Sequence, residues 1–207
     1  MTSIITGDII NSRAALKGQD WLGKLKGVLS NYGSRPKDWD IYRGDSFQLE
    51  ISVPSEVFLA AVHIKACIKT IAGLDVRIGI GIGAKDNDAE RIAEANGSAF
   101  VNSGEAFDAL ENKRQNLLIK TSSADVDQAL NTCFALTLLV MDQWTVNSAE
   151  AVKTYIENPL ASQQVLGNSL GIKQNTMSER LKRSGIKEIH DFEQLVFRKE
   201  LDNLLNP

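Results

Sequence analysis

The sequence predicts an α+β protein that ends in a small all-helical module. Two observations lead to this prediction: extended and helical patterns alternate over the first part of the chain, and no strand pattern follows residue 144. The chain has 207 residues, 43% of them apolar, which is enough for one substantial core and a second small one. We therefore expect an α+β domain over 1–144 and a helical domain over 145–207.

The first domain is expected to begin with a strand, a helix and two further strands. Residues 3–10 have an apolar, extended pattern, and apolar residues then recur at helical spacing over 21–29. Residues 39–52 predict two strands around the turn Gly44-Asp45, with alternate residues of the second strand apolar. These patterns give the order strand, helix, strand, strand.

A second helix and a further strand follow. Pro54-Ser55 opens a helix with an apolar stripe, and Gly73 ends it. Over 76–83 apolar residues alternate with Arg77 and three glycines, so one face of this strand is nearly bare and a backbone, ligand or partner can approach it closely. The resulting order β-α-β-β-α-β is that of the ferredoxin-like fold, a four-stranded antiparallel sheet.

Additional elements are expected around this unit. Residues 88–110 predict a helix, 117–121 a strand and 126–144 a long helix. A final helix follows Gly185, and its apolar residues at core spacing are Ile189, Phe192, Leu195 and Val196.

Composition limits the possible partners. The formal charge of −3 and the pI near 5.5 argue against binding to nucleic acid or anionic membrane that is driven by the charge of the whole surface. Any such binding must use a local basic patch. No apolar stretch approaches the roughly 20 residues that span a bilayer. The sequence starts directly with a strand pattern rather than a secretory signal, and we expect a cytoplasmic protein without membrane contact.

The cysteines and histidines give no sign of a metal centre. Cys67 and Cys133 lie in apolar helical patterns with no neighbouring Cys or His, so we expect reduced core residues. His63 and His190 stand alone on predicted helices, and each is expected to be a surface or packing residue.

Two Gly-Asp pairs are the strongest functional signal in the first domain. Gly7-Asp8 ends the first strand and Gly44-Asp45 forms the hairpin turn. The ferredoxin-like topology brings these two places to one edge of the sheet, so Asp8 and Asp45 are expected to be neighbours. Two carboxylates can hold Mg²⁺ or Mn²⁺ while phosphate oxygens complete the coordination shell. The alternative is simple turn chemistry, because Gly and Asp both favour tight hairpins.

The surroundings of this edge suit a phosphate-containing ligand. The loop after the first strand can offer backbone N–H groups and the cation of Arg13. The expected ligand-binding residues are Asn11, Ser12, Arg13, Arg43, Gly44 and Arg77.

These segments resemble a known group of enzymes. Ile41–Leu49 resembles the hairpin of class III nucleotidyl cyclases and the Gly-Gly-Asp-Glu-Phe hairpin of diguanylate cyclases. Asp8-Ile9 resembles their first-strand metal site, and Val76–Gly83 resembles the strand that begins Arg-Ile-Gly-Ile. Nearly the whole chain resembles the SatD family of bacterial proteins, in which such a domain precedes a helix-turn-helix. The resemblance implies a metal held by Asp8, Ile9 and Asp45.

The chain departs from the active cyclases at two places. Class III enzymes carry an Asn and an Arg four residues apart on a late helix; the Asn corresponds to Asn102, but position 106 is Ala. Diguanylate cyclases have Glu after the hairpin Asp, where this chain has Ser46. Without a charge clamp on the transferring phosphate, ligand binding is favoured over catalysis. The alternative is a divergent two-metal cyclase or nucleotidyltransferase, in which Arg13 or Arg77 would replace the missing arginine that binds the transferring phosphate.

The second domain contains a helix-turn-helix pattern. Residues 163–172 and 173–181 predict two helices joined by a tight turn, with Gly167 allowing the helices to cross closely and Gly171 allowing the turn. Five basic side chains and one acidic one lie between positions 173 and 187, which suits contacts to phosphates. The expected DNA-binding residues are Lys173, Gln174, Asn175, Ser178, Glu179, Arg180, Lys182 and Arg183. The alternative is a helical hairpin that merely packs on the first domain.

Together these features predict a DNA-binding transcriptional regulator whose first domain binds a nucleotide or another phosphate ligand with a divalent metal. A homodimer is expected, because two-fold DNA sites favour dimers. A divergent enzyme and a protein-interaction scaffold are the alternatives.

Overall fold

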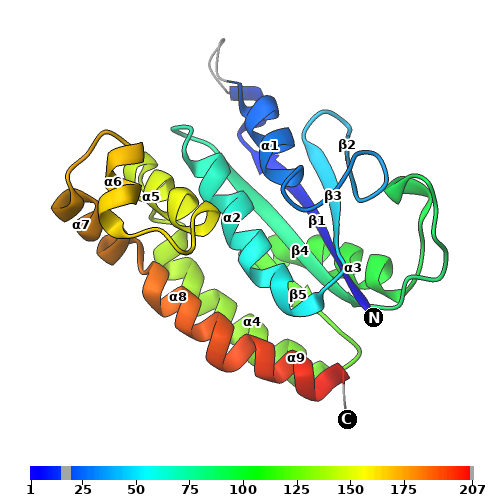
Figure 1. Cartoon of the computed structure of the whole chain (residues 1–207). Coiled ribbons are helices and arrows are strands. Elements are labelled where there is room, and N and C mark those ends of the chain that lie inside the picture. Colours follow the sequence, from blue (N-terminus) through cyan, green and yellow to red (C-terminus); the bar gives the residue numbers. More distant parts are fainter. Residues whose placement is uncertain (15–19, 206–207) are drawn as a thin grey trace.

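The structure is a computed structural model that describes residues 1–14 and 20–205. It is an α+β fold with a five-stranded mixed sheet (Figure 1). The strands are β1 (Thr2–Ile10), β2 (Trp39–Tyr42), β3 (Ser46–Ile51), β4 (Asp75–Gly83) and β5 (Leu117–Lys120). The α-helices are α1 (Trp21–Leu29), α2 (Val57–Lys69), α3 (Ser98–Lys113), α4 (Ala124–Met141), α5 (Val146–Glu157), α6 (Gln163–Ser169), α7 (Gln174–Ser184), α8 (Ile186–Phe192) and α9 (Arg198–Leu205).

The sheet has the strand order β2-β3-β1-β4-β5. β1 pairs antiparallel with both β3 and β4, β2 pairs antiparallel with β3, and β5 runs parallel to β4. In this register Asp8 is opposite Ser46 on one side and opposite Arg77 on the other. The end of β1, the β2-β3 turn and the start of β4 therefore meet at one edge of the sheet.

The residues of β4 alternate between the two faces of the sheet. Ile78, Ile80 and Ile82 of β4 belong to the main core together with apolar residues of α2 and α4. The glycine face of the same strand packs against α3: a Cβ at Gly81 would lie 2.2 Å from the carbonyl oxygen of Ala99. The predicted close approach is thus made by a helix backbone within the chain.

The helices after residue 145 form two groups (Figure 1). α5, α6 and α7 lie together at one end of the molecule, while α8 and α9 return along α4. Phe58 of α2 lies with its ring centroid 5.0 Å from that of Phe134, 5.1 Å from Phe192 and 5.4 Å from Phe197. The C-terminal helices therefore complete the core of the α+β layer.

The register predicted for the last helix is wrong in part. Ile189 is buried and Phe192 is partly buried, but Leu195 and Val196 are 71% and 39% exposed. A π-helical turn at Glu193–Phe197 separates α8 from α9 and shifts the buried stripe to Phe197 and Leu201. An ideal helical period cannot reveal such a turn.

Other boundaries also differ from the predicted ones. α3 begins at Ser98, ten positions after the expected start, because residues 84–97 form a connection that contains only a single short 3₁₀ turn. Cys67 is buried and Cys133 is partly buried, and both are free thiols. In the described part of the chain no helix has the length and apolar character needed to cross a membrane.

Candidate functional site

The acidic edge of the sheet is centred on Asp8, which lies near the end of β1. The Arg77 Nε donates to Asp8 Oδ1 at 2.9 Å and its Nη2 donates to Oδ2 at 2.5 Å. The hydrogen bonds from Arg77 to Asp8 raise the pKa of the guanidinium above its ordinary value, although partial burial opposes this. The Arg77 guanidinium carbon also lies 5.9 Å from the ring centroid of Phe107 on α3. The charge of Asp8 is therefore neutralised within the chain.

The hairpin turn brings Asp45 to the same edge. Its tip has left-handed backbone at Arg43 and Gly44, with φ of 52° and 91°. The Asp45 carboxylate accepts a hydrogen bond of 2.5 Å from the Ser12 hydroxyl, and its carbonyl accepts one of 3.2 Å from the Ile9 N–H. These two bonds tie the hairpin to the loop that follows β1.

The remaining predicted ligand residues divide into fixed and free groups. Asn11 has a φ of 63°, and its side-chain amide donates to the Gly73 carbonyl at 3.1 Å, so it supports the loop. Arg13 and Arg43 are exposed, and neither forms an ion pair with any residue that the structure describes. These two guanidiniums, which have no ion-pair partner in the described part of the chain, lie on the segments next to Asp8 and Asp45, a suitable setting for phosphate oxygens.

The residues at this edge supply only part of a metal-binding site. Within residues 1–14 and 20–205 no three His, Cys, Asp or Glu side chains gather in a metal-binding arrangement. Asp8 and Asp45 make a two-carboxylate set, which Mg²⁺ uses where substrate phosphates complete its shell. Because Arg77 engages both oxygens of Asp8, Asp45 is the better available ligand.

The three positions that were compared with cyclase residues in the sequence have structural roles in this chain. The Asn102 side-chain amide donates to the Ile82 carbonyl at 2.8 Å and holds α3 on β4. Ala106 is 4% exposed and packs with Leu110 and Leu118 between α3 and β5. Ser46 is the first residue of β3 and lies opposite Asp8 in the sheet.

The second region of interest is the pair α6 and α7. A Cβ at Gly167 would lie 2.9 Å from the Ile172 carbonyl oxygen, and the Ile172 N–H donates to the Gly167 carbonyl at 2.9 Å. Gly171 has a φ of 66° in the short connection, a conformation that glycine adopts without strain. Met177 and Leu181 lie on the buried face of α7. The two helices are therefore joined by a tight turn and pack closely against each other.

The predicted DNA-binding residues differ in exposure. Most of them are exposed to solvent: Lys173, Asn175, Glu179, Lys182 and Arg183. Gln174, Ser178 and Arg180 are partly buried. Arg180 Nη1 lies 3.4 Å from Glu150 Oε2, so its side chain faces α5 in this conformation.

Comparison with known protein families identifies the chain. The sequence model of the SatD family matches residues 3–195, nearly the whole length. The chain belongs to the SatD family. No curated protein matches it. The family resemblance predicted from the sequence is thereby confirmed.

One group in this SatD-family protein could not be predicted from its sequence. The Tyr32 hydroxyl is hydrogen-bonded to His63 Nδ1 at 2.8 Å, and His63 Nε2 lies 3.2 Å from Glu157 Oε1. His63 is 3% exposed, so it is a packing residue. Burial lowers its pKa, and burial also raises the pKa of Tyr32.

We call Tyr32, His63 and Glu157 the His63 relay. Its three residues come from elements that are distant in the sequence. Tyr32 follows α1, His63 belongs to α2 and Glu157 ends α5, so no local motif could have shown it. The other histidine, His190, is partly exposed with its Nδ1 3.9 Å from Glu193 Oε2. The relay connects the α+β layer to the helices that follow residue 145.

Proposed function

We propose that this SatD-family protein is a DNA-binding transcriptional regulator. In this proposal α6 and α7 form the helix-turn-helix, and α7 is the helix that enters the major groove. The preceding residues form a ferredoxin-like, nucleotidyl cyclase-like domain that binds a nucleotide or another phosphate ligand. The observation that carries the proposal is the exposed polar and basic face of α7.

The chemistry of this face suits DNA. Lys173, Lys182 and Arg183 are exposed cations at the two ends of α7, where they can contact phosphates. Asn175 and Glu179 are exposed between them, and amide and carboxylate groups are suited to reading base edges. A net acidic chain with such a local basic face favours one defined docking surface over diffuse binding.

The ligand part of the proposal rests on the acidic edge. The strand order β2-β3-β1-β4 with antiparallel pairing supports the ferredoxin-like assignment. Exposed Arg13 and Arg43 would bind phosphate oxygens, and Asp45 with Asp8 would hold Mg²⁺ or Mn²⁺ beside them. Such a metal supplies positive charge to the phosphates. The packed Ala106 leaves no cation at the position of the cyclase arginine, which favours binding over catalysis.

The proposal includes two statements about assembly and location. A helix-turn-helix protein commonly reads two half-sites related by two-fold symmetry, so we propose a homodimer. Its target is chromosomal DNA, so we propose that it works in the cytoplasm.

The DNA part is tested by retention of sheared genomic fragments on the immobilised full-length protein. The double variant Lys182→Ala/Arg183→Ala is expected to lose most of the retained DNA at moderate salt. Lys26→Ala/Lys113→Ala removes the same charge from exposed positions on α1 and α3 and should retain DNA as the unmodified protein does. Equal retention by all three proteins would refute the proposed interface.

The ligand part is tested by calorimetry with ATP and GTP in the presence of Mn²⁺. Arg43→Ala and Asp45→Asn are each expected to weaken binding, because they remove a guanidinium and a carboxylate from the edge. Binding that is unchanged in both variants would exclude the edge. Formation of a cyclic or dinucleotide product would favour the enzymatic alternative.

A further inference from the structure

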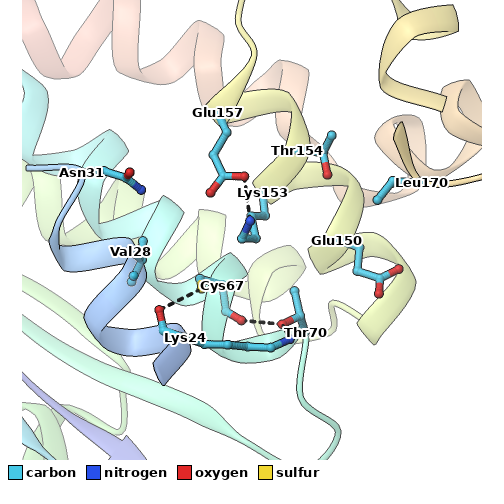
Figure 2. A pocket seen from close by; sticks show the side chains of 11 residues that line it. Lys24, Val28, Asn31, Cys67, Thr70, Glu150, Lys153, Thr154, Glu157 and Leu170 are labelled. Carbon is cyan, nitrogen blue, oxygen red and sulfur yellow. Dashed lines mark hydrogen bonds and ion pairs between the residues drawn. The ribbon is translucent and has the colours of Figure 1, made fainter. Parts of the chain in front are cut away.

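A cavity of about 490 Å³ lies between the α+β layer and the helices after residue 145 (Figure 2). Its walls come from α1, α2 and α5, with Leu170 after α6 at one side. Ligand pockets in proteins commonly have volumes between about 300 and 1,000 Å³, so the cavity can hold a small metabolite. It is separate from the acidic edge, because none of the residues at that edge line it.

One wall of the cavity offers a cation with unused donors. The Lys24 Nζ donates to the Thr70 hydroxyl at 2.7 Å, and Figure 2 shows its side chain extended along the cavity to Thr70. Among the described residues no carboxylate forms an ion pair with Lys24. A lysine ammonium has three donors, so two of them can bind an anionic ligand group. Asn31, which follows α1, adds a side-chain amide to the lining.

The facing helix offers a carboxylate. Glu150 of α5 lines the cavity, and its ion-pair contact with Arg180 is long at 3.4 Å. The other two charged residues of the wall neutralise each other, since Lys153 Nζ lies 2.6 Å from Glu157 Oε2. The charges left to a ligand are therefore the Lys24 ammonium from α1 and the Glu150 carboxylate from α5, which a ligand would share with or take from Arg180.

The rest of the lining is small or apolar. Val28 and Cys67 are buried side chains of α1 and α2, and Leu170 closes the side toward α6. Burial raises the pKa of the Cys67 thiol, which donates to the Lys24 carbonyl at 3.6 Å and so acts as a neutral wall. This lining suits an apolar ligand side chain.

We infer that the cavity is a binding site for a free α-amino acid with an apolar side chain. The ligand carboxylate binds Lys24, its ammonium binds Glu150, and its side chain packs against the α1 wall at Val28. The opposite charges on the two helices select a zwitterion over a simple acid or amine.

The site is positioned to affect α7. A ligand ammonium competes with Arg180 for the Glu150 carboxylate, and release of Arg180 adds a cation to the face of α7. Occupancy is therefore expected to strengthen DNA binding several-fold, a consequence that rests on the proposed function. The ligand site itself does not depend on that function.

Calorimetry on the full chain with each proteinogenic amino acid in turn tests the site. At least one apolar amino acid is expected to bind, and its matched amine and matched carboxylic acid should bind about tenfold or more weakly. Lys24→Met and Glu150→Gln should each weaken the binding, whereas Lys26→Met, which lies outside the cavity lining, should leave it unchanged. Absence of binding by every amino acid, equal binding of amine or acid, or full binding by both cavity variants would overturn the inference.

The coupling has a separate readout. Affinity for a retained genomic fragment is measured with and without the amino acid that calorimetry identifies. A ligand that binds without changing DNA affinity would overturn the link through Arg180 and leave the site standing. If the protein binds no DNA, the proposed function fails and calorimetry still decides the site.

Discussion

At the residue scale, the charged side chains of the acidic edge differ in whether they are already paired. Both carboxylate oxygens of Asp8 accept hydrogen bonds from Arg77, whereas Arg13 and Arg43 have no ion-pair partner among the described residues. The sequence predicted that Asp8 and Asp45 lie at one edge, because the order of elements determines which strand ends meet. The pairing of Asp8 with Arg77 depends on the β1-β4 register, which no local pattern specifies.

The glycines around α3 give a matched stability test. A Cβ at Gly81 would lie 2.2 Å from two backbone atoms of α3, so Gly81→Ala is expected to destabilise the fold by about 3 kcal/mol. Gly104 lies inside α3, and a Cβ there would meet no neighbouring atom within 4 Å, so Gly104→Ala should stabilise by about 0.5–1 kcal/mol. Urea unfolding measures both values. Similar effects of the two substitutions would contradict the packing of α3 on the bare face of β4.

The buried histidine predicts a pH dependence. Burial lowers the pKa of His63 below its ordinary value of 6.5, while Glu157 opposes this shift. The unfolded chain then binds the proton at a higher pH than the folded chain, so the contribution of His63 is complete above pH 6.5 and declines as the pH falls below it. His63→Gln removes this titration. Urea unfolding at a series of pH values should show a smaller loss of stability on acidification in the variant, and equal losses would argue against a neutral buried imidazole.

At the element scale, alternation in the sequence predicted β3 and β4, because alternate residues of these two strands are apolar and reach the main core. The bare glycine face was predicted as a site of close approach, and α3 occupies it. The start of α3 and the stripe of the last helix could not be predicted, since a long connection and a π-helical turn both depart from regular periods. The relay of Tyr32, His63 and Glu157 was also inaccessible, because its members come from three separate elements.

The π-helical turn leads to a test on neighbouring residues. Phe197 is fully buried against Phe58 and Phe134, so Phe197→Ala is expected to cost about 4 kcal/mol. Leu195 is 71% exposed, so Leu195→Ala should change stability by less than about 0.5 kcal/mol. Thermal and urea unfolding distinguish the two. A large loss of stability on Leu195→Ala together with a small loss on Phe197→Ala would contradict the π-helical turn and support a regular helical register.

At the scale of the whole molecule, side-chain contacts of several kinds join the α+β layer to the later helices. The phenylalanine cluster packs α8 and the π-helical turn on α2 and α4, the His63 relay links α2 to α5, and Trp144 Nε1 donates to the Ser184 carbonyl at 2.8 Å. The apolar core is continuous across residue 145. Packed side chains therefore connect α1, α2 and α5 to α7, which the proposed ligand-responsive regulator would need.

The central claim is that the exposed face of α7 binds DNA through its cations. The most direct test is the salt dependence of affinity for a retained genomic fragment, measured by fluorescence anisotropy with the full chain. Each phosphate contact contributes about 0.9 to the slope of log affinity against log salt, so Lys182→Ala/Arg183→Ala should lower that slope by about 2. Lys26→Ala/Lys113→Ala should leave it unchanged. Equal slopes for all three proteins would contradict the claim.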